Sequence, residues 1–380
     1  MSYRNRFFGI LKKLTLFSLI VAVAIPFYYS STSHQYVCLR FYHSMLSLKY
    51  SLISDQSRPT LSADYRAFEE IMLNVPLAEL DQKVDILNVI KDLRTTFTMN
   101  TIIPKPSQCQ INKEAFQHDE QLVDTYWINY SKKKFEKNSD KLLVYFHGGG
   151  YMLGDIHSYS GFECHLSYLF NLTILHLEYR LCPEHPLPAC VDDAVALYHA
   201  LLRNNISPSQ ILIMGDSAGG GLSLLTIQTL IARQLSIPRG VIVLSPWTDL
   251  SASGESYKRN RQIDIIFRNT KEDDDEIVKL MLGPNHSQLS ADNPIFSPLF
   301  GSFEGFPPMY INVGTAEILE DDSRRVLNKA QEARVAVTFE EGLHLMHAYP
   351  VFFLYYPEAR NTLNNINKWI QQIFDEKLNE

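Results

Sequence analysis

Short, mainly apolar runs of residues in the last two thirds of the chain constrain its fold more than any other feature. They are Lys141–Phe146, Leu172–Leu177, Ile211–Met214, Val241–Leu244 and Met309–Val313. Strands without a polar face are buried on both sides of a sheet. Segments with helical spacing, such as Asp192–Leu202 and Gly221–Ala232, separate these runs. The alternation predicts the α/β class, with a mostly parallel central sheet flanked by helices.

The segments outside this pattern are expected to be helical. Phe68, Ile71 and Met72 share one helix face, and an apolar residue recurs at every third position from Val84 to Leu93. We therefore expect a helical cap region over residues 35–104 and an α/β domain over residues 105–380. Residues 254–290 interrupt the alternation and are expected to add to the cap. Their acidic run 271–276 is interpreted as the solvated start of a helix, not as a metal site.

The composition is that of a globular protein and narrows the classes of partner. Hydrophobic residues make up 46% of the 380 residues, charged residues make up 20%, and the net charge is −7. This charge, without a basic stripe, argues against a nucleic-acid partner. The five cysteines lack the CxxC and Cys/His spacings typical of zinc sites, so no metal is expected. Their odd number leaves at least one free thiol, and most are expected to be buried.

The N-terminus carries a candidate membrane anchor. Basic residues at positions 4, 6, 12 and 13 precede the uncharged, mostly apolar stretch Leu14–Tyr29, which would make roughly 24 Å of helix. The basic flank predicts a cytosolic N-terminus with the rest of the chain across the membrane. A signal peptide cleaved near Ala22–Ala24 is the alternative. Glycosylation sequons in the body fit either interpretation; they begin at Asn129, Asn171, Asn205 and Asn285.

A glycine-flanked serine follows one of the predicted strands and precedes a predicted helix. The sequence reads Gly215-Asp216-Ser217-Ala218-Gly219. This G-x-S-x-G pattern in a strand–turn–helix context is typical of a nucleophile elbow, which exposes the serine hydroxyl above the sheet. Glycines are needed because a β-carbon does not fit beside so sharp a turn. Ser217 is therefore the candidate nucleophile.

A second motif, His147-Gly148-Gly149-Gly150, directly follows another predicted strand. Successive glycines let backbone N–H groups approach a ligand oxygen closely. The tetrahedral intermediate of ester cleavage carries an oxyanion that needs such fixed donors. We expect Gly148, Gly149 and the N–H of Ala218 to form an oxyanion hole. His147 itself is expected to brace the loop, whereas His157, His176 and His185 are expected to have no catalytic role.

Together these motifs resemble the hormone-sensitive lipase and arylacetamide deacetylase family of α/β-hydrolases. The segments Tyr179–Pro188, Asp192–Ala194 and Leu244–Leu250 match further signatures of that family. The resemblance implies the α/β-hydrolase fold and a serine carboxylic-ester hydrolase that uses no cofactor. With its single anchor, the chain also resembles fungal steryl acetyl hydrolases and arylacetamide deacetylases of the endoplasmic reticulum. This implies a single-pass type II protein with a lumenal catalytic domain, acting on lipophilic esters such as acetylated sterols or xenobiotics.

A catalytic triad requires an acid and then a histidine after the serine. The resemblance places the acid at Glu317, where the family usually has Asp; Asp321 and Asp322 follow one helical turn later, and Asp249 fits a structural turn better. Aligned without gaps from Glu317, the family's histidine falls on His347. The alternative base is His344, which follows Gly342-Leu343.

The expected chemistry is acyl transfer to water through an acyl-enzyme on Ser217. Two other functions remain open from the sequence. The same triad could cleave arylamides as an amidase or deacetylase, or the chain could be a non-catalytic, ligand-binding relative.

Overall fold

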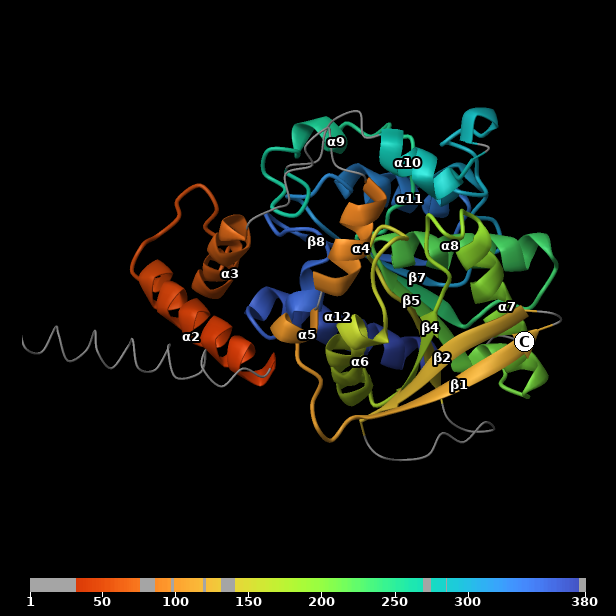
Figure 1. The fold of residues 1–380 in the computed structure, drawn as a ribbon, viewed down its shortest axis with the longest axis horizontal. Coiled ribbons are helices and arrows are strands. Elements are labelled where there is room, and N and C mark those ends of the chain that lie inside the picture. Colours follow the sequence, from red (N-terminus) through yellow and green to blue (C-terminus); the bar gives the residue numbers. More distant parts are fainter. Residues whose placement is uncertain are drawn as a thin grey trace, which may run out of the picture.

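The computed structural model describes residues 32–75, 86–96, 99–118, 121–130, 141–268, 275–284 and 286–375. Within them, an 8-stranded sheet has the order β1-β2-β4-β3-β5-β6-β7-β8 (Figure 1). The strands are β1 (Gln110–His118), β2 (Gln121–Asn129), β3 (Leu142–Phe146), β4 (Thr173–Glu178), β5 (Ile211–Asp216), β6 (Gly240–Leu244), β7 (Met309–Gly314) and β8 (Val337–Gly342).

The sheet is parallel from β4 to β8 and antiparallel at its other edge. Strands β4, β3, β5, β6, β7 and β8 pair in parallel, whereas β1 pairs antiparallel with β2 and β2 antiparallel with β4. The five apolar runs in the sequence are the strands β3 to β7, so the predicted mostly parallel α/β sheet is confirmed. The hairpin β1–β2 and the edge strand β8 were not among the predicted runs.

Helices cover both faces of the sheet because each inner strand is apolar on both sides. In β5, Ile211 and Ile213 pack in one hydrophobic cluster, and Leu212 and Met214 pack in the other. The first cluster contains residues from α7 (Ala189–Arg203), α8 (Ala218–Ala232) and α11 (Glu320–Glu332). The second contains residues from α6 (Ile156–Phe170) and α12 (Pro357–Asp375).

The N-terminal helices are α2 (Thr32–Ser51), α3 (Ala63–Asn74), α4 (Ile86–Thr96) and α5 (Met99–Ile102). Of these, α2 and α3 lie to one side of the sandwich, whereas α4 is drawn over its middle (Figure 1). The predicted helix around Phe68 is α3, and its buried face rests on the C-terminal part of the chain, with Phe68 4.6 Å from Tyr355 between ring centroids. In α4, Ile90 is buried but Leu87 is exposed. The apolar residues at every third position therefore do not all lie on the buried face of this helix.

The long connection between β6 and β7 also departs from the regular alternation of strands and helices. It carries the short helices α9 (Ser256–Arg259) and α10 (Asp275–Leu282). Residues 271–274 of the acidic run lie outside the described residues. The division into a cap over 35–104, a hydrolase domain over 105–380 and a cap insertion over 254–290 stays a prediction.

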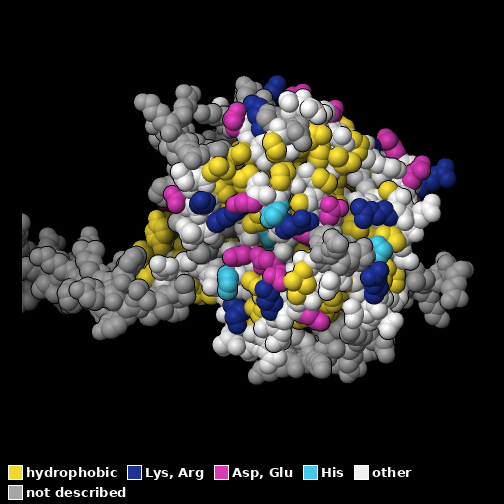
Figure 2. All heavy atoms as spheres, turned by 45° about the vertical axis from the view of Figure 1, so that its right-hand side comes forward, with side chains coloured by type: hydrophobic (Ala, Val, Ile, Leu, Met, Phe, Trp, Pro, Cys, Tyr) yellow, Lys and Arg dark blue, Asp and Glu magenta, His cyan; other side chains and the backbone are white. Residues whose placement is uncertain are grey.

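The face shown in Figure 2 carries charged side chains of both signs. On the face in Figure 2, acidic and basic side chains are interspersed and form no continuous basic stripe. Several are paired directly: Arg94 with Glu184 at 2.7 Å and Lys113 with Asp124 at 2.7 Å. Pairs this exposed contribute little to stability, because water and salt screen them.

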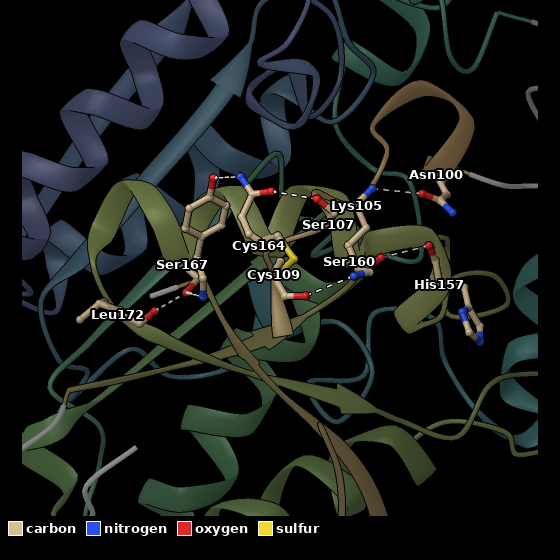
Figure 3. Close-up of a disulfide and its surroundings, with 11 residues drawn as sticks. Asn100, Lys105, Ser107, Cys109, His157, Ser160, Cys164, Ser167 and Leu172 are labelled. Atoms are coloured by element: carbon tan, nitrogen blue, oxygen red, sulfur yellow. Dashed lines mark hydrogen bonds between the residues drawn. A yellow bond between two sulfur atoms is a disulfide. The ribbon is translucent and has the colours of Figure 1, made fainter. Parts of the chain in front are cut away.

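A disulfide joins the start of the β1–β2 hairpin to the first helix on the sheet. Cys109 precedes β1, Cys164 lies in α6, and their sulfur atoms are bonded (Figure 3). Cys38, Cys182 and Cys190 are free thiols, the last two buried. The bond therefore ties the antiparallel edge of the sheet to the layer that contains α6.

Removal of this disulfide is expected to destabilise the fold. It closes a loop with a sequence separation of 55. Chain-entropy arguments give such a loop about 4 kcal/mol as an upper value, so the double variant Cys109→Ala/Cys164→Ala should unfold at a clearly lower urea concentration. Cys38→Ser is the control, since it leaves the disulfide in place and should remain sensitive to reductant. Equal urea midpoints for oxidised wild type and the double variant would contradict this role.

Candidate active site

Ser217 lies in a sharp turn between β5 and α8. Its backbone has φ 53° and ψ −121°, its N–H donates to the Leu244 carbonyl at 2.8 Å, and its carbonyl accepts from the Trp247 N–H at 2.9 Å. A β-carbon on Gly219 would stand 2.0 Å from the Phe146 carbonyl oxygen, so only glycine fits where β3 meets the turn. The turn is thus fixed by the two neighbouring strands, and it lifts Ser217 above the carboxyl end of β5.

His347 and Glu317 form a buried hydrogen-bonded pair. His347 Nδ1 contacts Glu317 Oε2. The other oxygen, Oε1, accepts from Ser245 Oγ at 2.6 Å and from the Gly314 N–H at 2.7 Å. The Glu317 carboxylate is therefore held by β6 and β7 on one side and faces the imidazole on the other. Ser245, at the end of β6, belongs to the Leu244–Leu250 signature, but the sequence did not indicate its role.

The order of the strands brings this pair to the same edge as Ser217. Strand β6 lies between β5 and β7, and β7 pairs with β8, so the chain segments that follow these strands share one edge of the sheet. The segment after β8 is fastened there: the Ala348 N–H donates to Ser245 Oγ at 2.9 Å, and the Ala316 N–H donates to the Leu345 carbonyl at 3.0 Å. The site is thus built from consecutive strand ends.

His344 occupies a different position in the same turn. Its backbone is left-handed, with φ 63°, and its N–H donates to Thr315 Oγ1 at 2.7 Å. Its side chain is partly exposed, whereas His347 is 6% exposed and contacts Glu317. Of the two histidines, the one that faces the carboxylate is therefore His347.

The surroundings of His347 favour its protonated form. Burial alone would lower its pKa, but the charge of Glu317 and the hydrogen bond to it outweigh burial and raise the pKa above 6.5, with further help from Asp264 and Asp216. Asp264 is fully buried and accepts the Ile318 N–H at 2.8 Å. Phe267 covers the imidazole edge-on, with ring centroids 5.1 Å apart. The segment after α9 therefore closes over the histidine, which the sequence alone did not indicate.

The loop of Gly148–Gly150 is anchored through Asp216, the residue before the serine. The Gly148 N–H donates to Asp216 Oδ1 at 3.0 Å, and the hydroxyls of Tyr145 and Tyr159 donate to the same carboxylate at 2.6 Å and 3.2 Å. A β-carbon on Gly148 would stand 2.3 Å from Asp216 Oδ2. The Gly148 N–H is therefore engaged within the protein.

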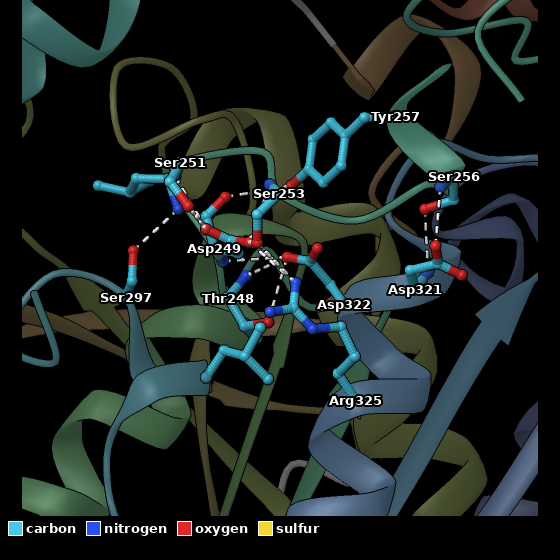
Figure 4. Close-up of polar contacts among 12 residues, drawn as sticks. Thr248, Asp249, Ser251, Ser253, Ser256, Tyr257, Ser297, Asp321, Asp322 and Arg325 are labelled. Atoms are coloured by element: carbon cyan, nitrogen blue, oxygen red, sulfur yellow. Dashed lines mark hydrogen bonds and ion pairs between the residues drawn. The ribbon is translucent and has the colours of Figure 1, made fainter. Parts of the chain in front are cut away.

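The acids considered as alternatives to Glu317 have other partners (Figure 4). Asp322 accepts the Thr248 and Asp249 N–H groups at 2.8 Å and 3.0 Å. Asp249 pairs with Arg325 at 3.0 Å. Asp321 accepts the N–H of Ser256 at 2.8 Å. Burial raises the pKa of Asp322 to about 8, although its backbone donors act against the shift. These carboxylates fasten the start of the β6–β7 connection to α11.

Comparison with known proteins agrees with this geometry. A family model described as the alpha/beta hydrolase fold matches residues 143–351. The chain belongs to the α/β-hydrolases. It is 32% identical to an esterase of Acinetobacter venetianus over 61% of this chain and 75% of the relative. It is 33% identical to an acetyl-hydrolase of Streptomyces hygroscopicus over 60% of this chain and 74% of the relative.

The solved structures point to one branch of these α/β-hydrolases. An esterase of the bacterial hormone-sensitive lipase family superposes with a TM-score of 0.70 at 27% identity, over 83% of this chain and 99% of that chain. The predicted family is thereby confirmed: this α/β-hydrolase is of the hormone-sensitive lipase type. Its activity is that of a serine carboxylic ester hydrolase.

The predicted location in the endoplasmic reticulum membrane is wrong. The two relatives described above, an esterase and an acetyl-hydrolase, are bacterial proteins. In the part of the chain that the structure describes, no helix has the length and apolar character needed to span a membrane. The predicted anchor at residues 14–29 itself lies outside the described residues.

Proposed function

We propose that Ser217 is the nucleophile, His347 the general base and Glu317 the acid that orients it. The observation that carries this proposal is the buried His347–Glu317 pair at the same sheet edge as the Ser217 elbow. His347 Nε2 takes the Ser217 proton as the hydroxyl attacks the ester carbonyl, and returns it to the leaving alcohol. In the second half of the reaction, His347 takes a proton from water as the water attacks the acyl-enzyme, and then returns it to the Ser217 oxygen as the acid product leaves.

The oxyanion would be held by backbone N–H groups of the glycine loop and of α8. The N–H of Ala218 lies at the first turn of α8, where helix N–H groups are free of intrahelical partners. Gly149 and Gly150 have left-handed backbones, with φ 115° and 62°, which turn the loop. We assign the three donors to Gly149, Gly150 and Ala218, with Gly150 in place of Gly148, because the Gly148 N–H already donates to Asp216.

The substrate is proposed to be an apolar ester with a short acyl group. Aromatic residues adjoin the catalytic segments: Tyr151 follows the glycine loop, Trp247 bonds to the Ser217 carbonyl, and Phe267 covers His347. Their rings suit an apolar group. The Streptomyces relative, named an acetyl-hydrolase, supports the same class.

A fluorophosphonate probe and a substrate panel test this function together. The probe should label wild type at Ser217, as located by peptide mass spectrometry. p-Nitrophenyl acetate and butyrate should be cleaved faster than the palmitate, and faster than matched anilides, whose amine leaving groups need more complete protonation. Failure of labelling would contradict the nucleophile, whereas a preference for anilides would favour an amidase with the same triad.

The pH profile should report the raised pKa of His347. Only the neutral imidazole can act as a base, so kcat/KM falls as the pH drops through its pKa. Because that pKa is raised, the acid limb should lie above pH 6.5. Asp264→Asn removes one of the charges that raise it, and should move the limb to lower pH. Asp292→Asn, at an exposed position, is the control and should leave the limb in place. An unmoved limb in Asp264→Asn would exclude His347 as the titrating group.

A further inference from the structure

A second cluster of histidine and carboxylate side chains lies behind the glycine loop. Strands β3 and β4 pair in parallel with Tyr145 opposite His176, so two residues further on His147 and Glu178 project to the same face. Glu163 reaches the cluster from α6, which packs on that face. His147, His176 and Glu163 are fully buried. The Glu178 side chain is 28% exposed and gives the cluster a route to solvent.

Both imidazoles are oriented through Nδ1 and have buried Nε2 atoms without a hydrogen bond; the Nε2 of His176 lies 3.4 Å from Glu178 Oε2. His176 Nδ1 lies 2.7 Å from Glu163 Oε1, and His147 Nδ1 lies 2.8 Å from the Gly148 carbonyl oxygen. Neither Nε2 has a hydrogen-bond partner, although both are buried. A buried polar atom without a partner is costly. Metal-binding histidines have this arrangement: one nitrogen donates to a carboxylate or a backbone carbonyl, and the other is left for the ion.

We propose that His147, His176 and Glu178 bind one divalent transition-metal ion of the Zn²⁺ type. One potential ligand atom from each residue lies within 4.8 Å of the others. His176 Nε2 and Glu178 Oε2 are 3.4 Å apart. Two ligands of a tetrahedral zinc ion with bonds of roughly 2.1 Å are separated by about the same distance. Among the described residues, this is the one group of three such side chains with that proximity.

The ligand types select the class of ion. Two imidazole nitrogens and one carboxylate oxygen suit Zn²⁺, whereas Mg²⁺ and Ca²⁺ prefer oxygen ligands throughout. A water molecule would complete the tetrahedron. The ion would tie β4 to His147, the residue before the glycine loop, and so hold that loop beside Ser217. It would take no part in ester cleavage, and the proposal does not depend on the proposed triad.

The alternative occupant of the cluster is a proton. With both nitrogens of His176 protonated, the ring would lie between Glu163 and Glu178 as a buried ion triad without a metal. A metal would have to displace that proton, so binding should release protons and weaken at acid pH. Whether the protein binds Zn²⁺ therefore decides whether the cluster holds a metal ion or a proton.

Zinc titration of the full chain tests the proposal. After chelator treatment and removal of the chelator, calorimetry and elemental analysis should find one Zn²⁺ per wild-type chain. Glu178→Gln removes a ligand at a partly exposed position and should weaken binding by at least about a hundredfold. Zn²⁺ should raise the Tm of wild type but not of this variant. His157→Ala, at an exposed position of α6, is the matched control and should bind as wild type does.

Further variants make each outcome decisive. His347→Gln should retain the zinc, since a loss there would place the ion at the active site and overturn the proposal. Should Glu178→Gln fail to fold by circular dichroism, His176→Gln replaces it. If neither variant folds, Co²⁺ bound to wild type must show the intense d–d bands of a four-coordinate site. No stoichiometric binding at micromolar Zn²⁺, unchanged affinity in a folded ligand variant, or a six-coordinate Co²⁺ spectrum each overturns it.

Discussion

Ser217→Ala is expected to lower kcat for p-nitrophenyl butyrate by at least about ten-thousandfold. Loss of the nucleophile removes the acyl-enzyme route entirely, and what remains is the weak effect of binding and oxyanion donors on attack by water. The elbow should survive, because its hydrogen bonds to Leu244 and Trp247 come from the Ser217 backbone and not from its hydroxyl. The measurement is steady-state kinetics with circular dichroism on the same preparation.

Ser223→Ala provides a matched comparison for the nucleophile. Ser223 lies in α8, is fully buried, and donates its hydroxyl to the Gly219 carbonyl at 2.8 Å. This substitution should leave activity near that of wild type and alter stability only slightly. A folded Ser217→Ala enzyme with activity within tenfold of wild type would disprove the assignment of the nucleophile.

His347→Ala should lower turnover by at least roughly a thousandfold, the scale of losing a triad base. The imidazole that contacts Glu317 belongs to His347, and no other side chain in this turn replaces that contact. His344→Ala should cost about tenfold or less, through changes in the turn that carries His347. The two variants differ by three positions in one segment, so they also control for each other.

His344→Asn refines the comparison of the two histidines. Position 344 has a left-handed backbone, which asparagine tolerates better than alanine. If the cost of His344→Ala is only strain in the turn, the asparagine variant should recover most of the activity. A larger loss for His344→Ala than for His347→Ala would mean that the base had been assigned three residues too late.

The sequence predicted the centre of the sheet better than its edges. Strand β3 is apolar at every position because helices cover both of its faces, and such a run stands out without knowledge of its neighbours. Strand β1, Gln110–His118, lies at one edge and is mainly polar. Strand β8 lies at the other edge, and all of its residues except Gly342 are partly or fully exposed. Edge strands carry no continuous apolar signal, so their assignment needs the pairing partner.

The predicted site was limited in the same way by contacts that are distant in sequence. The elbow could be found because it follows a predicted strand in a recognisable local pattern, and Glu317 and His347 could be found because the family resemblance places an acid and a histidine at these positions. The hydrogen bond from the Gly148 N–H could not be predicted, because its acceptor, Asp216, lies at the end of a different strand. Asp264 also escaped notice, since only the folded β6–β7 connection brings it to Ile318.

The β6–β7 connection has a consequence for the surroundings of His347. Asp264 is fastened to Ile318, and Ser297 accepts the N–H of Leu250 at 2.8 Å. The stretch of chain between Asp264 and Ser297 is therefore bracketed by two fixed points on the catalytic scaffold. Phe267 lies in this stretch and covers His347, so exchanges at that position would change the surroundings of the proposed base while the two fixed points stay in place.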